Sequence, residues 1–376
     1  MSKIALRKLW FQLHKWIGLL LAILIIPLSL SGAVLVWDEA VDHVLNPARY
    51  ATTGTTTLDP QRYVAAARAT LKPGERIASL ALPERDGPVQ VTALTPPEPG
   101  RRGPPPRSVV YLDPPTAQVL AVADTRSGVL RVLHNLHGNL LVPGVGRQIV
   151  GWIGVAMLLS CVSGLWLWWP TVGRWARGLR WRRHRNTDTN LHHLFGFWIA
   201  LPLFVLSLTG VWIAFPQVFA GIGGGGAGPG AGPGAGPAAR GPGGPGARPL
   251  VLESPSLALD AVLSRAGSVT PGSIARVEWP TDRKPEWKVQ FAGSTAVTVD
   301  DATGDASAAR PERETLARTM RRLHDGTRMG FVWQLLVFLG GILPAILAVT
   351  GIIMWWRARG WKAALKAKQR GAEAAR

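Results

Sequence analysis

Four apolar runs that lack any charged residue set the strongest limit on how this chain folds. They cover residues 16–37, 149–169, 194–215 and 331–356. A helix needs about 20 apolar residues to cross the hydrocarbon core of a bilayer. The first run is too long for a signal peptide, and no small-x-small cleavage site follows it. The sequence therefore predicts a multi-pass membrane protein with four transmembrane helices.

The formal net charge of +19 lies mostly in three segments outside these runs. Residues 1–15, 170–190 and 357–376 together hold 17 Lys and Arg side chains and two acidic ones. Four spans place these segments on one side of the membrane, which the positive-inside rule identifies as the cytoplasm. We therefore expect cytoplasmic chain termini and basic segments that contact lipid phosphates, with no role in nucleic-acid binding. Docking of an acidic partner is the alternative.

The spans divide the chain into membrane and soluble segments. We expect a cytoplasmic start with span 1 (1–37), an outer domain (38–146), span 2 (147–169), a basic loop (170–193), span 3 (194–215), a Gly/Pro-rich linker (216–249), a second outer domain (250–328), span 4 (329–356) and a basic tail (357–376). In each outer domain the residue pattern predicts one helix followed by strands. The helices are expected at 63–71 and 257–266, and the strands at 76–82, 89–94, 108–112, 118–123, 273–279, 287–291 and 296–299.

An internal repeat relates the two halves of the chain. At an offset of 178 residues, His14 aligns with His192. At an offset of 187 residues, His137 aligns with His324, and the hairpins of the outer domains align as well. Each half therefore consists of a span, an outer domain and a second span in the same orientation. Parallel repeats of this kind are related by an axis along the membrane normal, so we expect matched residues to face each other across that axis.

The repeat separates four histidines from the other four. His14 and His192 lie at the cytoplasmic ends of spans 1 and 3, and His137 and His324 lie just outside the outer ends of spans 2 and 4. Ionisable residues in or near spans are rare and often functional. Two facing imidazoles can supply both axial ligands of one haem, so the pattern predicts two bis-histidine haems, one near each membrane face. Interfacial anchoring is one alternative; a zinc or iron site is another, although tetrahedral zinc needs four ligands in one place.

Two neighbouring histidines are alternative ligands. His134 lies three residues before His137 and would share its helical face. His193 is adjacent to His192 and points about 100° away from it on a helix, so at most one of the two faces the axis. The single cysteine, Cys161, provides no CxxCH attachment motif, and non-covalent haem b is the predicted cofactor.

Small residues recur near the histidines and within the spans. Gly18 and Gly196 each follow a histidine by one helical turn, where a missing side chain leaves room for a porphyrin plane. Four Ser/Thr-Gly pairs also recur in the repeat, and we interpret them as contacts that let helices approach closely in lipid. They are Ser31-Gly32, Ser163-Gly164, Thr209-Gly210 and Thr350-Gly351.

At these residues the chain resembles the PepSY-associated transmembrane family. The motifs that carry the resemblance are Leu13-His-Lys-Trp-Ile-Gly-Leu-Leu, Leu136-His-Gly-Asn-Leu-Leu, Ser163-Gly-Leu-Trp-Leu-Trp-Trp, Leu191-His-His-Leu-Phe-Gly-Phe-Trp, Leu208-Thr-Gly-Val-Trp, Leu323-His-Asp-Gly and Val349-Thr-Gly. The hairpins at 110–114 and 297–304 are similar to the end of a PepSY module. The resemblance implies a mostly α membrane protein with a four-helix bundle and two small periplasmic α+β PepSY-like domains.

The resemblance also implies a function. The family includes inner-membrane reductases of ferric siderophores in Gram-negative bacteria, with haem in the helix bundle. We accordingly expect an enzyme of the bacterial inner membrane that transfers electrons to a ferric siderophore or another periplasmic ferric chelate. The donor would be a quinol or a cytoplasmic flavoprotein. The alternatives are a non-enzymatic PepSY protein that senses a signal or regulates a protease, and a permease, which would need a polar path at mid-membrane.

Overall fold

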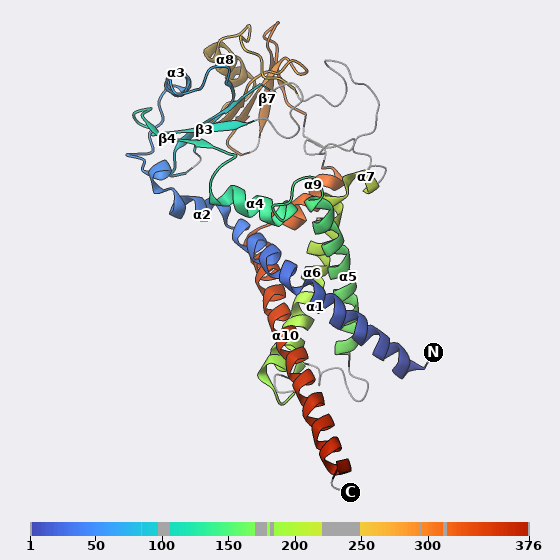
Figure 1. Cartoon of the computed structure of the whole chain (residues 1–376). Helices are drawn as coiled ribbons and strands as arrows, with labels where there is room; N and C mark the ends of the chain where they lie inside the picture. The colour runs from blue at the N-terminus through green and yellow to red at the C-terminus, as the bar shows by residue number, and fades with distance from the viewer. Residues whose placement is uncertain are drawn as a thin grey trace. The chain divides into compact units, whose positions relative to one another are not determined.

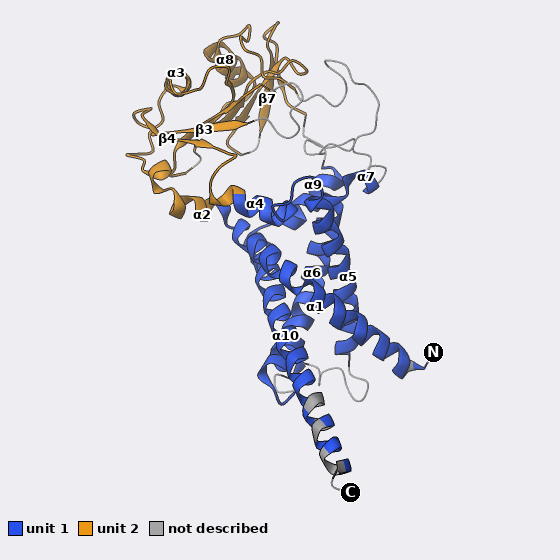
Figure 2. Ribbon diagram, viewed as in Figure 1, with its two compact units in different colours: residues 1–38, 132–230, 314–376 blue, residues 39–131, 231–313 orange. Residues whose placement is uncertain are grey.

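A computed structural model describes residues 2–83, 85–96, 106–169, 179–180, 184–219, 249–293, 295–310 and 314–374. The chain forms two compact units (Figure 2). The helix unit comprises residues 1–38, 132–230 and 314–376, and the sheet unit comprises residues 39–131 and 231–313. Most of the predicted linker 216–249 lies outside the described residues, as does the greater part of the basic loop before residue 184.

Four long helices form the body of the helix unit (Figure 1). They are α1 (Lys3–Leu35), α5 (Gly146–Trp168), α6 (Thr187–Ala214) and α10 (Phe331–Ala374). Each contains a stretch long and apolar enough to cross a membrane. The prediction of four spans in a multi-pass membrane protein is therefore confirmed. Helices α1 and α10 extend beyond the apolar runs into the basic segments that flank them.

Close contacts between small residues hold these helices together. Helix α1 packs along α10, and α5 packs along α6. A Cβ atom added at Gly341 of α10 would lie 2.6 Å from the carbonyl oxygen of Ser29 and 2.6 Å from Cβ of Ala33. One added at Gly154 of α5 would lie 2.8 Å from Cγ2 of Val211. Without a hydrophobic driving force in lipid, such close approach provides the van der Waals contact that joins helices.

Two short helices that we did not predict from the sequence precede the spans α5 and α10. They are α4 (Val129–Asn139) and α9 (Leu316–Asp325). Gly326 ends α9 in a left-handed conformation (φ +76°), and its N–H donates to the carbonyl of Arg322. Glycine adopts this backbone conformation without steric cost. The short helix α7 (Pro216–Phe219) follows α6.

The sheet unit contains one antiparallel sheet of eight strands. Their order across the sheet is β4-β3-β2-β1-β5-β6-β7-β8. The strands are β1 (Arg76–Ala81), β2 (Val89–Leu94), β3 (Arg107–Leu112), β4 (Val119–Asp124), β5 (Ile274–Glu278), β6 (Glu286–Phe291), β7 (Ala296–Asp300) and β8 (Ala306–Ala308). Helices α3 (Pro60–Arg68) and α8 (Leu259–Val269) contribute to the same hydrophobic core as the strands. Helix α2 (Asp38–Leu45) and the 3₁₀ helix η1 (Pro47–Tyr50) precede α3.

The strands lie where the sequence predicts them, with β8 in addition, but the two outer segments share one sheet. Strand β1 pairs with β5, and Leu80 lies opposite Val277 at the junction. Both side chains are fully buried in a core that draws on both segments. Pairing satisfies the N–H and C=O groups that β1 and β5 would otherwise expose as edge strands. We expected two small domains, and the structure joins them into one.

The equivalent hairpins of the two segments make the same backbone hydrogen bonds. The N–H of Asp113 donates to Gln118 and that of Ala117 donates to Asp113. At an offset of 187 residues, the N–H of Asp300 donates to Asp305 and that of Gly304 donates to Asp300. The two turns therefore share one backbone geometry although their side chains differ.

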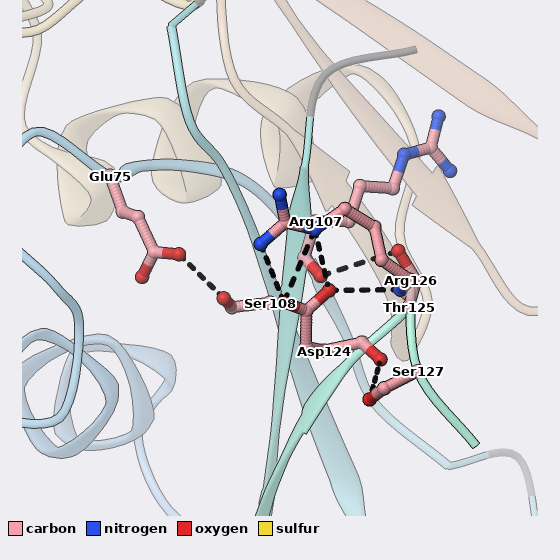
Figure 3. Close-up of polar contacts among 7 residues, drawn as sticks. All are labelled: Glu75, Arg107, Ser108, Asp124, Thr125, Arg126 and Ser127. Carbon is pink, nitrogen blue, oxygen red and sulfur yellow. Dashed lines mark hydrogen bonds and ion pairs between the residues drawn. The ribbon is translucent and has the colours of Figure 1, made fainter. Parts of the chain in front are cut away.

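Polar contacts close one end of the β3–β4 hairpin (Figure 3). Asp124 forms an ion pair with Arg126 at 2.8 Å, and the hydrogen bonds from Arg126 lower the pKa of Asp124 to about 2. Ser108 of β3 donates from Oγ to the carboxylate of Glu75 at 2.5 Å. The N–H of Thr125 donates to the carbonyl of Arg107, so these contacts link β3 both to Glu75 before β1 and to the turn after β4.

Candidate functional site

The four histidines matched by the repeat meet in two pairs within the helix unit. His14 of α1 faces His192 of α6, with ring centroids 6.4 Å apart and ring planes at 87°. His137 of α4 faces His324 of α9, with centroids 6.0 Å apart and planes at 41°. All four residues are half-buried. Each pair takes one ring from each half of the chain.

The neighbouring histidines do not join these pairs. The His193 ring lies against His184, with centroids 4.5 Å apart. His134 is exposed on α4, whereas His137 on the same helix is half-buried. His43 lies in the sheet unit against Tyr50. Of the alternatives left open by sequence spacing, the structure brings His192 and His137 into the pairs.

Hydroxyl groups contact the rings of the His14–His192 pair. Nδ1 of His14 lies 2.9 Å from Oγ of Ser163, and Nδ1 of His192 lies 2.9 Å from Oγ1 of Thr350. Ser163 donates its own proton to the carbonyl of Ser160, and Thr350 donates to that of Ile346. Each hydroxyl oxygen can therefore accept a hydrogen bond from the N–H at Nδ1. This arrangement favours the tautomer in which Nε2 carries the lone pair.

Backbone carbonyls contact the rings of the His137–His324 pair. Nδ1 of His137 lies 2.8 Å from the carbonyl oxygen of Leu28, and Nδ1 of His324 lies 3.1 Å from that of Leu206. Oγ1 of Thr209 is also 3.1 Å from Nδ1 of His324. Because a carbonyl oxygen only accepts hydrogen bonds, Nδ1 must carry the proton here too. All four rings thus keep Nε2 available as a ligand atom.

The glycines of the four Ser/Thr-Gly pairs lie directly against the imidazole rings. A Cβ atom added at Gly32 would be 2.6 Å from Cε1 of His137. The distance to the nearest histidine Cε1 would be 3.2 Å at Gly164, 3.2 Å at Gly210 and 3.6 Å at Gly351. At these glycines the close approach of another helix that we predicted is made by a histidine ring. The histidines that fill the space come from helices distant in sequence, and a pattern along one span does not reveal them.

The separation of the rings fits one metal ion between each pair. A metal–imidazole bond is about 2 Å long and a ring nitrogen lies about 1.1 Å from the centroid, so two imidazoles on opposite sides of one ion have centroids about 6.2 Å apart. The observed 6.4 and 6.0 Å lie on either side of that value. Among the described residues no group of three or more His, Cys, Asp or Glu side chains is placed to hold a metal ion.

The two glycines one helical turn from His14 and His192 are not crowded by neighbouring side chains. Among the described residues, a Cβ atom added at Gly18 would meet no atom within 4 Å. One added at Gly196 would first meet Cδ2 of Leu347, at 3.9 Å. The donor set and these gaps are therefore compatible with haem.

The two pairs lie far apart along the bundle. From His14 to Gly32, which contacts His137, helix α1 runs 18 residues, or about 27 Å at 1.5 Å per residue. From His192 to Gly210, which contacts His324, α6 runs the same number of residues. This length is close to the thickness of a bilayer's hydrocarbon core, about 30 Å.

The environment of the His137–His324 pair keeps both rings neutral. Burial lowers the pKa of His137 below its usual value. Burial, together with the nearby His137, lowers the pKa of His324 to about 4. Neutral imidazole is the form that binds metals. Of the arginines near this pair, Arg322 forms an ion pair with Glu314 at 3.2 Å.

Comparison with known proteins agrees with this architecture. The family model described as the PepSY-associated TM region matches residues 11–358. The uncharacterized protein PA4219 of Pseudomonas aeruginosa is 30% identical over 250 residues, which cover 63% of this chain. The chain spans 57% of the length of that relative. On the match across nearly its whole length, the chain belongs to the PepSY-associated transmembrane family.

Proposed function

We propose that this protein is a haem-containing reductase of the bacterial inner membrane. It passes electrons from the cytoplasmic side to a periplasmic acceptor, which we propose to be a ferric siderophore or another ferric chelate. The observation that carries the proposal is the presence of two imidazole pairs, each with the spacing of two axial ligands, about 27 Å apart along the helices. A pair of redox centres separated in this way bridges most of a bilayer.

The histidines have defined roles in this proposal. His14 and His192 would hold one haem b at the end of the bundle that carries the basic segments, and His137 and His324 would hold a second at the opposite end. The acceptors at Nδ1 fix the tautomer of each ring and so direct Nε2 to the iron. Haem bound at these sites supplies a one-electron couple at each end of the bundle.

The proposed acceptor and donor follow from the direction of transfer. One electron converts the ferric ion of a chelate to the ferrous ion, whose softer character weakens its bonds to hard oxygen ligands. A quinol that loses two electrons would reduce two ferric chelates and release two protons. A reduced cytoplasmic flavoprotein is the other candidate donor. The basic segments 1–15 and 357–376 support a cytoplasmic location for the end of the bundle with His14 and His192, by the positive-inside rule.

The first test is the cofactor content of the purified full chain. We expect a red protein with a low-spin Soret band, a sharp reduced α-band, and two haems b per chain in a pyridine haemochrome assay. A colourless protein that takes up no haem when supplied with it would exclude the reductase. That result would favour the sensor or protease-regulating role.

The second test assigns the two sites. We expect His137→Ala and His324→Ala each to abolish one haem of the two, and the same one, because both substitutions remove a ligand of the same iron. His134→Ala is the matched control, since His134 lies on the same helix but is exposed, and it should retain both haems. Loss of both haems from either ligand variant would contradict the assignment of two independent pairs.

A further inference from the structure

Each of the four imidazoles is held by the same local arrangement. The Ser/Thr-Gly pair of a neighbouring span contacts the ring, with the glycine against Cε1. An acceptor of the same helical turn lies at Nδ1: a hydroxyl of the pair for His14 and His192, and a carbonyl three residues before the Ser or Thr for His137 and His324. Contacts at two atoms of a planar ring fix its rotation as well as its position.

The two pairs differ in the angle between the planes of their two rings. The planes of His14 and His192 are nearly perpendicular, at 87°, whereas those of His137 and His324 lie at 41°. The acceptors differ in part: hydroxyls contact Nδ1 in the first pair, a backbone carbonyl contacts Nδ1 of His137, and both a carbonyl and the Thr209 hydroxyl contact Nδ1 of His324. The distance from an added Cβ to the nearest histidine Cε1 is shortest at Gly32 (2.6 Å) and longest at Gly351 (3.6 Å).

We propose that the Ser/Thr-Gly pairs are positioning residues that set the two histidine pairs at different angles, and so make the two metal sites electronically distinct. The proposal rests on the proposed function, since it concerns the iron that these rings would hold. Each axial imidazole interacts through its π system with one iron d orbital. Perpendicular planes distribute that interaction over two orbitals and leave them nearly equal in energy, whereas planes closer to parallel separate the two energies.

Electron paramagnetic resonance of the oxidised full chain in detergent tests this proposal directly. Low-spin ferric haem with perpendicular axial planes gives a highly anisotropic signal, and haem with planes closer to parallel gives a rhombic one. We expect both signals in equal amounts. His14→Ala should remove the anisotropic signal, and His324→Ala should remove the rhombic one.

Glycine substitutions test whether the Ser/Thr-Gly pairs cause the difference. In Gly32→Ala the added Cβ would lie 2.6 Å from Cε1 and 2.9 Å from Nδ1 of His137, so the ring must turn or shift. We expect the rhombic signal to change its g values or disappear while the anisotropic signal stays unchanged. Gly360→Ala is the control, because its added Cβ would meet nothing within 4 Å among the described residues and Gly360 contacts none of the rings. It should leave both signals as they are.

Substitutions of Thr350 provide a second test that does not depend on crowding. Thr350→Val preserves the shape of the side chain and removes the acceptor at Nδ1 of His192, so the anisotropic signal should shift. Thr350→Ser restores a hydroxyl and should restore the signal. A merely structural role for Thr350 would give the same signal in all three proteins.

The possible outcomes separate this inference from the proposed function. If the parent protein takes up no haem, both fail. If it holds two haems with a single type of signal, or if Gly32→Ala and Thr350→Val leave the spectrum unchanged, the reductase proposal survives and this inference is overturned. Two signals that respond separately to the two substitutions would support it.

Discussion

Asp113 shows how a single buried carboxylate makes the sheet unit sensitive to acid. It accepts hydrogen bonds from the N–H and Oγ1 of Thr53 and from Oγ1 of Thr116, all between 2.5 and 2.7 Å. Burial acts to raise the pKa of Asp113, but these hydrogen bonds outweigh it and hold the pKa below its usual value. A carboxylate with a lowered pKa in the folded state stabilises the fold above its unfolded pKa and loses that contribution as the pH falls.

We therefore expect Asp113→Asn to lower the thermal stability of the full chain at neutral pH. The difference from the parent protein should shrink as the pH is lowered to about 3, because protonation removes the same interaction from the parent. Thermal unfolding in detergent across this range measures the effect. Asp86→Asn serves as the control, because the Asp86 carboxylate is exposed. A difference that stays constant with pH would contradict this account.

The sequence was sufficient to select the four histidines that form the two pairs but not their surroundings. His14, His137, His192 and His324 stand out because each has a partner at a fixed offset in the repeat. The choice of His137 over His134 required the structure, since both fit one helical face. The role of Gly32 also required it, because the ring it contacts comes from a helix about 100 residues further along the chain.

At the scale of elements, Gly341 is a close contact between α1 and α10. Its added Cβ would lie 2.6 Å from a backbone oxygen, which cannot move aside as a flexible side chain can. We expect Gly341→Ala to reduce stability by about 1–3 kcal/mol, which is the usual cost of overpacking a close contact. Unfolding of the purified protein in mixed micelles with increasing denaturing detergent measures the change.

Gly360 provides the control in the same helix. It is exposed, and among the described residues its added Cβ would meet nothing within 4 Å. Gly360→Ala should therefore leave stability unchanged or raise it by up to about 1 kcal/mol through helix propensity. If Gly341→Ala and Gly360→Ala reduced stability equally, the close contact between α1 and α10 would not explain the effect of Gly341→Ala.

The elements differed in how well the sequence predicted them. The spans were predictable because an uncharged run of this length has few alternatives, and the strands because apolar and polar residues alternate along them. Helices α4 and α9 were missed because they are short and amphipathic. A short helix of this kind is stabilised by the elements on which its apolar face packs, and the local sequence does not identify those elements. Strand β8 has three residues, too few to establish a period.

At the scale of the whole molecule, the continuous sheet makes the two outer segments one cooperative structure. Leu80 is fully buried in β1, at the pair of strands that joins the segments. We expect Leu80→Ala to reduce the stability of the sheet unit by about 2–5 kcal/mol, the usual range for such a truncation in a core. Hydrogen–deuterium exchange should accelerate in β2 and in β6 together.

Val122→Ala is the control, because Val122 is 50% exposed on β4. A surface substitution of this kind usually changes stability by less than about 0.5 kcal/mol. If Leu80→Ala accelerated exchange in β2 but left β6 unchanged, the two segments would behave as separate domains, as the sequence alone had suggested. The sequence could not show that the two segments form one sheet, because nothing in β1 or β5 specifies which strand each of them pairs with at its open edge.

Strand β1 pairs antiparallel with β5: Leu80 lies opposite Val277, Ser79 opposite Glu278, and Ala81 opposite Arg276. Two copies of a single strand would pair in the same way around a twofold axis, as in an isologous dimer interface. Each histidine pair likewise draws one ring from each half of the chain. Each half thus contributes one strand to the junction of the sheet and one ring to each histidine pair. Two identical half-length chains would meet in the same way, whereas in one covalent chain the two contributions are free to differ.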